Sequence, residues 1–250
     1  MFKGFYNLTS GMLTQQRNLN VVSHNLTNIS TAGFKADKYT SSTFDDVMYS
    51  RIGNKYKVGA QNIGRQSYIR ASSQVYTDYT QGIPEPTGIA LDFFIEGNGF
   101  FAIQPENGGV VYTRAGNFSL DEEGYLCLSS FGRVLDNNGQ AILLGTDKIV
   151  GDRYGRIFTE TGGYLGQLGV YDFADYGQLE HNGQGFFTGA GAQAIETPSI
   201  RHQYLERSNV DMISQMTEMI SSQRALQSAA QVSKMYDSLM TKATNDIGRL

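Results

Sequence analysis

The sequence of 250 residues contains no tryptophan, one cysteine, four prolines and three histidines. With Cys127 alone, no intramolecular disulfide can form, so cysteine usage does not fix the redox compartment. The leucines on either side of Cys127 predict that it is a small apolar core residue in a strand. His24, His181 and His202 lie in three separate regions, without the short spacing of a zinc site. We therefore expect neither a metal nor a cofactor.

Long apolar runs and strong charge are also missing. No stretch approaches the ~20 apolar residues that span a bilayer, and polar residues interrupt the N-terminus too often for a cleavable secretion signal. Charged residues make up 18% of the chain and the net charge is -4, with no dominant basic patch. Nucleic-acid binding and membrane insertion are therefore not expected. If the protein leaves the cytoplasm, we expect a route that needs no such signal.

Apolar residues recur near the N-terminus at alternating steps of three and four, which is the spacing of a coiled-coil seam. Gly33 follows this stretch and can adopt the left-handed conformation that ends helices. The pattern predicts one long helix with a single apolar stripe. Its positions are Phe5, Leu8, Met12, Gln15, Leu19, Val22, Leu26 and Ile29, of which only Gln15 is polar.

A second helix is predicted at the C-terminus, because neither proline nor glycine interrupts the sequence from Asn209 to Ile247. Ser208 or Asn209 is expected to cap it, and Asp211 suits the positive end of its dipole. A helix this long with one stripe needs a partner, and the N-terminal helix is the obvious one. Two ordinary helices packed on a sheet are the alternative. The apolar positions are Met212, Met216, Met219, Leu226, Ala229, Val232, Tyr236, Leu239 and Ala243.

The middle of the chain has short aromatic and β-branched segments between turn signals, which predicts a β-meander or barrel. Residues 35–74 are polar and rich in tyrosine, as in a linker. The glycine-rich segment 185–191 is predicted to be a loop. Strands are predicted at 75–79, 89–95, 100–104, 110–114, 125–128, 133–135, 157–158 and 165–173, and turns at 96–99, 106–109, 121–124 and 136–139.

The predicted fold class is therefore α+β, with long N- and C-terminal helices that pair as a coiled coil and a mainly antiparallel β domain in the middle of the chain. The predicted domains are residues 1–34 (first half of the coiled coil), 35–74 (linker with extended structure), 75–207 (β domain) and 208–250 (second half of the coiled coil).

Four motifs, in order, resemble the signatures of the flagellar basal-body rod and hook protein family. They are NLTNISTAGFK at 25–35, LDFFIEGNGFF at 91–101, YTRAGNF at 112–118 and SNVD at 208–211, followed by matches through residue 225. Thr27, Phe94, Gln215 and Leu226 depart from the residues usual in the family. The motif positions that we carry over are Asn25, Asn28, Thr31, Gly33, Phe34, Gly97, Gly99, Phe100, Phe101, Ser208, Asn209 and Val210.

The resemblance implies a structural subunit of the basal-body rod that serves motility. It implies export of the unfolded chain through the flagellar type III apparatus, and head-to-tail polymerisation with other rod and hook subunits into a helical drive shaft. The predicted subunit interface is formed by the apolar residues of both stripes other than Ala229 and Ala243. We expect the helices to be disordered before assembly, because ordering costs roughly 1–2 kcal/mol per residue. The length favours a proximal-rod protein, whereas segment 44–52 resembles distal-rod members.

Parts of the sequence suggest two other functions. A cell-wall hydrolase needs two carboxylates facing each other across a cleft, but the pairs Asp45-Asp46, Glu122-Glu123 and Asp172 with Asp175 are predicted to be solvated loop charges. The glycines at 97–99 are not followed by the pattern of a phosphate-binding loop. We therefore predict that the protein is not an enzyme. The remaining alternative is an adhesin or coat-type β protein oligomerised through its helices, which would elute as a defined oligomer.

Overall fold

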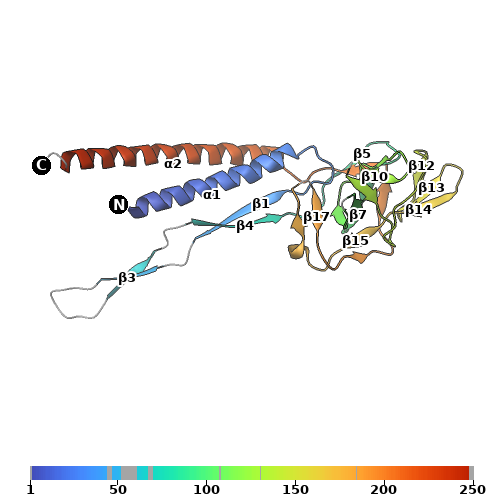
Figure 1. Ribbon diagram of the computed structural model, residues 1–250, viewed down its shortest axis with the longest axis horizontal. Helices are drawn as coiled ribbons and strands as arrows, with labels where there is room; N and C mark the ends of the chain where they lie inside the picture. The colour runs from blue at the N-terminus through green and yellow to red at the C-terminus, as the bar shows by residue number, and fades with distance from the viewer. Residues whose placement is uncertain are drawn as a thin grey trace. The chain divides into compact units, whose positions relative to one another are not determined.

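The computed structural model describes residues 2–43, 47–51, 61–66, 70–106, 108–129, 131–183 and 185–247 (Figure 1). The chain divides into two compact units. The helical unit comprises residues 1–26, 37–76 and 212–250, and the β unit comprises residues 27–36 and 77–211. Both terminal helices and the antiparallel sheets between them are present, so the predicted α+β class is confirmed.

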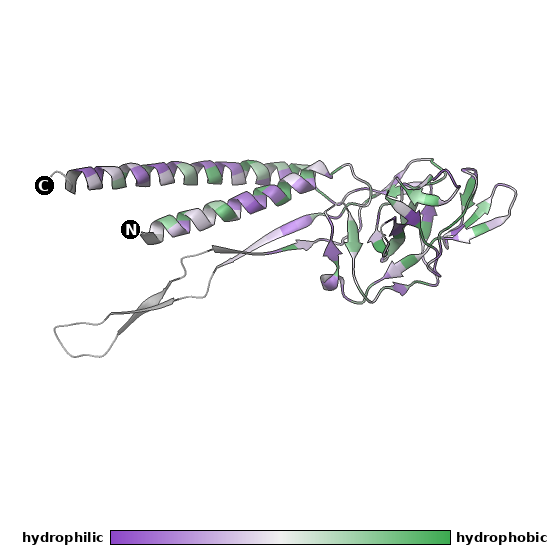
Figure 2. Ribbon diagram, in the orientation of Figure 1, coloured by the Kyte–Doolittle hydropathy of each residue, from purple (hydrophilic) through white to green (hydrophobic). Residues whose placement is uncertain are grey.

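The helical unit contains α1 (Phe2–Thr27) and α2 (Met212–Ile247). In Figure 2, apolar and polar residues alternate along both helices, which is the pattern that predicted them. The polar segment predicted as a linker also contributes strands. β1 (Asp37–Thr43) pairs with β4 (Arg70–Thr77), and β2 (Val47–Arg51) pairs antiparallel with β3 (Gln61–Gln66).

The largest sheet of the β unit has the order β16-β17-β8-β7-β11-β10-β9, with β15 and β18 joined to it through β7. Three smaller sheets are β12-β13-β14, β19-β6 and β20-β5. The strands are β5 (Pro84–Pro86), β6 (Phe93–Ile95), β7 (Phe100–Pro105), β8 (Val111–Thr113), β9 (Ser119–Leu120), β10 (Leu126–Leu128), β11 (Gly132–Val134), β12 (Ile149–Gly151), β13 (Arg156–Thr159), β14 (Tyr164–Gln167), β15 (Val170–Asp172), β16 (Glu180–His181), β17 (Phe186–Thr188), β18 (Gln193–Ala194), β19 (Ile200–His202) and β20 (Tyr204–Glu206), with a short 3-10 helix at Tyr176–Gln178.

Strand β7 is buried on both faces. Successive strand side chains point to opposite faces, so Phe100 and Phe101 enter different clusters. Phe101 packs in the main core with Phe93 and Leu126, and Phe100 packs in a second aromatic cluster with Phe187. The Phe-Phe doublet of the second motif thus fills two cores at once.

Three sequence expectations are wrong in detail. The segment 185–191 is not only a loop, because it contains β17, which pairs with β8 and buries Phe187. The strand predicted at 165–173 is two strands, β14 and β15. Cys127 is not in the core: Leu126 and Leu128 point inward, so Cys127 points to the opposite face, where it is half-buried and its Sγ lies 3.3 Å from Ser119 Oγ.

Candidate assembly surface

Three passages of the chain meet within the β unit, at residues 33–36, 77–82 and 206–210, and we name this region the crossing. The Gly33 N–H donates to the Glu206 carbonyl oxygen at 2.7 Å. The Asp78 N–H donates to the Ala36 carbonyl oxygen at 2.8 Å. Backbone segments far apart in sequence are therefore joined directly, without an intervening side chain.

Asn209 holds all three passages together through its side chain. Its Oδ1 accepts a hydrogen bond from the Ala36 N–H at 2.7 Å, and its Nδ2 donates to the carbonyl oxygens of Asp78 and Thr80 at 2.8 and 3.1 Å. Val210 packs beside it against Phe34. The sequence prediction that Ser208 or Asn209 caps α2 is therefore wrong, because α2 begins at Met212 and the Asn209 oxygen is bound to another part of the chain.

A buried cluster of charges lies at the crossing. Glu206 Oε1 accepts from Lys35 Nζ at 2.6 Å and from the Gly82 N–H at 2.8 Å, while Oε2 lies 3.4 Å from Arg114 Nη1. The three charged side chains are each 4% exposed or less. Burial lowers the pKa of Lys35, and attraction to Glu206 opposes that shift. Burial likewise lowers the pKa of Arg114, again against Glu206.

Gly33 fits the crossing for two reasons. Its φ is +69°, which is in the left-handed region that favours glycine. In addition, a Cβ at this position would lie 2.3 Å from backbone atoms of Arg114 and Ala115. Arg114 Nη2 also donates to the Gly97 carbonyl oxygen at 2.7 Å. The motifs at 25–35, 91–101, 112–118 and 208–211 therefore all contribute residues to one place.

Sequence reasoning did not single out Glu206, and it included Arg114 only as part of the motif at 112–118. The other motif residues serve local structure. Asn28 Oδ1 accepts from Thr31 Oγ1 at 3.2 Å in the turn after α1, and Ser208 Oγ accepts from the Val210 N–H at 3.3 Å. Gly99 has a φ of +115° just before β7.

In the helical unit, polar side chains join α1 to α2. Asn18 Nδ2 donates to Glu218 Oε1 at 2.9 Å and to Ser222 Oγ at 3.0 Å. Asn25 Nδ2 donates to Gln215 Oε1 at 3.2 Å, and Asn25 also exchanges two hydrogen bonds with the backbone of Asp37. The two helices lie side by side, whereas their packing as a coiled coil stays a prediction.

The apolar residues predicted for the interface are mostly accessible in the single subunit. In α1, Val22 is buried, Phe5 is exposed, and Leu8, Met12, Leu19 and Leu26 are half-buried, as is Ile29 in the turn that follows. In α2, Met219 and Leu226 are half-buried. The exposed members are Met212, Met216, Val232, Tyr236 and Leu239.

Further exposed apolar side chains extend these positions into two patches on α2. The 212–220 patch consists of Met212, Ile213, Met216 and Ile220, and the 232–240 patch consists of Val232, Met235, Tyr236, Leu239 and Met240. Ile213 is 77% exposed and Leu239 is 63% exposed. Because contiguous exposed apolar patches mark interaction sites, both are candidate contact surfaces. The narrow seam pattern omitted Ile213, Ile220, Met235 and Met240.

Comparisons with known proteins agree with this architecture. Family models match residues 5–35 (flagella basal body rod protein), 94–150 (flagellar hook protein FlgE/F/G D1 domain) and 201–246 (flagellar basal body rod FlgEFG protein C-terminal). The flagellar basal-body rod protein FlgG of Bacillus subtilis (strain 168) is 31% identical, over 98% of this chain and 99% of its own length. The chain belongs to the flagellar basal-body rod protein family.

Two further relatives also match over nearly their full length. FlgG of Caulobacter vibrioides is 31% identical over 95% of this chain and 96% of its own length, and the flagellar hook-basal body complex protein FlhO of B. subtilis is 28% identical over the whole of both chains. The protein is thus a structural subunit of the flagellar basal-body rod, located in the basal body and assembled with other axial proteins of the flagellum.

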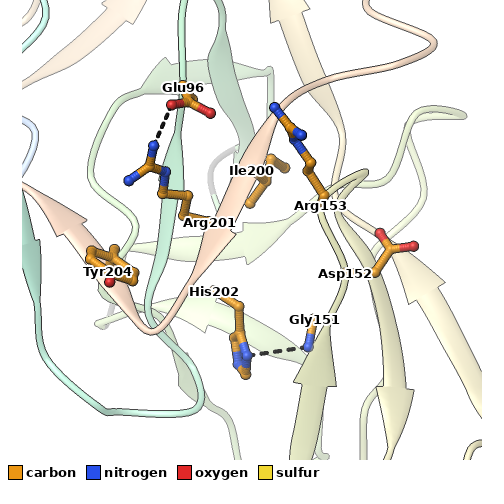
Figure 3. Close-up of a pocket in the computed structure, with 8 residues that line it drawn as sticks. All are labelled: Glu96, Gly151, Asp152, Arg153, Ile200, Arg201, His202 and Tyr204. Carbon is orange, nitrogen blue, oxygen red and sulfur yellow. Dashed lines mark hydrogen bonds and ion pairs between the residues drawn. The ribbon is translucent and has the colours of Figure 1, made fainter.

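An open cleft of about 450 Å³ in this rod subunit contains two carboxylates, Glu96 and Asp152 (Figure 3). A hydrogen bond from Arg201, at 2.6 Å, is the main cause that lowers the pKa of Glu96. Burial alone would raise the pKa of Asp152, but hydrogen bonds from Arg156 and from the backbone outweigh it and lower that pKa. A general acid needs a raised pKa, so neither group suits the role of general acid.

His202 also lines this cleft, where its ring connects two backbone segments. Its Nδ1 accepts from the Gly151 N–H at 3.3 Å, and its Nε2 lies 2.6 Å from the Ala90 carbonyl oxygen, to which it can donate. Within the described ranges, no three His, Cys, Asp or Glu side chains are grouped to hold a metal ion. In the same ranges, neither helix is long and apolar enough to cross a membrane.

Proposed function

We propose that the apolar stripes of α1 and α2 are the surface through which copies of this subunit polymerise into the rod. The observation that carries the proposal is the pair of exposed patches on α2, at 212–220 and 232–240. Burial of apolar area is the main favourable term in association. A head-to-tail contact that does not close into a ring gives a helical filament, as a drive shaft for motility requires.

In this proposal, α1 and α2, within residues 1–34 and 208–250, form the inner coiled-coil domain of the assembled rod. Residues 35–74 are the connecting segment, and residues 75–207 are the outer β domain. The chain is exported unfolded by the flagellar type III apparatus, without a cleaved signal, and it has no catalytic activity. Its net charge of -4 supports partners that are proteins rather than nucleic acids.

The test is the double substitution Ile213→Asp/Ile220→Asp, introduced into the flagellar strain that produces this protein. Both side chains are exposed in the subunit, so the purified variant should keep the wild-type melting temperature. Charge in the contact surface should abolish swimming and remove the subunit from isolated basal bodies. Gln227→Asp/Gln231→Asp adds the same charges at exposed polar positions of α2 and should leave swimming intact.

If the Ile213→Asp/Ile220→Asp strain swims as well as the control strain, the 212–220 patch is not the assembly surface. Gel filtration gives a second readout, because an isolated rod subunit should be monomeric. A stable oligomer of the purified wild-type protein would instead support an adhesin or coat-type protein.

A further inference from the structure

Three contacts between α1 and α2 share one antiparallel register, and the Asn18–Glu218 hydrogen bond lies one helical turn away from it. The residue numbers add to 240 in the Asn18–Ser222 and Asn25–Gln215 hydrogen bonds. They add to 240 again for Gly4 and Tyr236, where a Cβ built on Gly4 would lie 3.0 Å from the Tyr236 hydroxyl oxygen. Three contacts along the length of α1 therefore agree on a single alignment.

The side chains in these three contacts are mainly polar, unlike the seam predicted from the sequence. Ser222 is 4% exposed and is the one fully buried side chain among those described in α2. Asn25 is 1% exposed. The larger apolar residues of α2, such as Ile213, Met235 and Leu239, take no part in these contacts and are exposed. Hydrogen bonds rather than apolar packing thus distinguish this alignment of the helices from others.

We propose that Asn18 and Ser222 determine which alignment α1 and α2 of one chain adopt. A slide by one heptad would separate the Asn18 amide from both Ser222 and Glu218. It would place Asn25 opposite Ser222 in one direction or Asn18 opposite Gln215 in the other, so at most one polar pair could form in place of the two observed. An apolar contact does not discriminate in this way, whereas a polar group at a seam position is known to fix register. An unmade buried hydrogen bond costs the full desolvation of its groups.

This selection keeps the apolar patches of α2 facing outward. It also disfavours pairing between chains in any other register, because such pairing loses the same hydrogen bonds. The inference holds whether or not the patches carry the assembly contacts, since it concerns pairing inside a single subunit.

The experiment measures the register in the full-length protein with Cys127 replaced by serine. Spin labels are attached at Gln16→Cys and Arg224→Cys, which are exposed positions that the same register places opposite each other. Double electron–electron resonance should give one distance population. In Asn18→Leu/Ser222→Leu, we expect further populations offset along the axis by about 10 Å, which is one heptad at 1.5 Å per residue. Light scattering should show a dimer fraction formed by helix exchange.

Two control variants distinguish the loss of the Asn18–Ser222 hydrogen bond from the effect of adding leucine side chains. Asn20→Leu/Ser221→Leu adds two leucines at exposed positions and should keep the single population. The reciprocal exchange Asn18→Ser/Ser222→Asn retains one hydroxyl and one amide at these two positions and should also keep it. The proposal is overturned if Asn18→Leu/Ser222→Leu keeps the wild-type distance, if the Asn20→Leu/Ser221→Leu control broadens equally, or if the wild-type chain itself gives no single population.

Discussion

Lys35 and Glu206 are 171 positions apart in the sequence, and Lys35 Nζ donates to the Glu206 carboxylate at 2.6 Å inside the β unit. Arg114 binds the other oxygen of the same carboxylate. One buried carboxylate therefore pairs with two buried cations. Removing the carboxylate would leave two unpaired charges, whereas removing either cation would leave the other ion pair intact.

Glu206→Gln should destabilise the protein more than Lys35→Met. Without the carboxylate, two buried cations lose their counter-charge, and breaking a buried pair in this way costs about 3–5 kcal/mol. Lys35→Met leaves Glu206 paired with Arg114 and the Gly82 N–H, so its cost should be on the order of 1–3 kcal/mol. Urea unfolding, followed by tyrosine fluorescence, measures both. Equal losses would mean that the cluster is not organised around Glu206.

Gly33→Ala should be more damaging than Gly88→Ala. Both glycines have a φ near +70°, but a Cβ meets no atom within 4 Å at Gly88, whereas it meets the Arg114 backbone at Gly33. The left-handed conformation alone costs an alanine roughly 1–2 kcal/mol. The overlap at Gly33 should add about 1–3 kcal/mol more. Thermal unfolding of the two variants compares them, and similar melting temperatures would contradict the tight approach.

The Glu96 carboxyl should titrate below its ordinary pKa of 4.5. A depressed folded pKa stabilises the fold above the unfolded value and loses that contribution as the pH falls through the folded pKa. Arg201→Gln removes the main cause and should move the pKa of Glu96 back upward. Carbon-13 NMR of the side-chain carboxyls follows both proteins. A value above 4.5 in the wild type would reopen the possibility of general acid catalysis.

Hydrogen exchange should be faster at the end of α2 than in its middle. The shared register leaves residues 239–247 beyond the start of α1, and the side chains described there are exposed. Residues 215–229 of α2 lie alongside α1, and their amides should exchange at least ~10-fold more slowly than those of residues 239–247. Segments with more packing contacts open less often. Uniformly fast exchange along both helices would instead support the prediction that they order only on assembly.

The sequence predicted the helices, most strands and the family, because each depends on local spacing. Periodicity identified α1 and α2, and turn signals such as 136–139 separated the strands. Periodicity could not say which side of a helix faces its partner, because Asn18 and Ser222 resemble ordinary surface residues. Likewise, Asn209 looked like a helix cap, since nothing local shows that Ala36 and Asp78 lie beside it.

The crossing has a consequence for how such a chain can vary. A backbone hydrogen bond joins residue 33 to residue 206, and another joins residue 36 to residue 78. The segment between residues 33 and 206 therefore begins and ends at adjacent points, and so does the shorter segment between residues 36 and 78. A loop whose ends are already joined can be lengthened, shortened or exchanged for another without moving its anchor points. The crossing thus allows the protein to be built from interchangeable modules, with Asn209 and Gly33 as the residues that no exchange can omit.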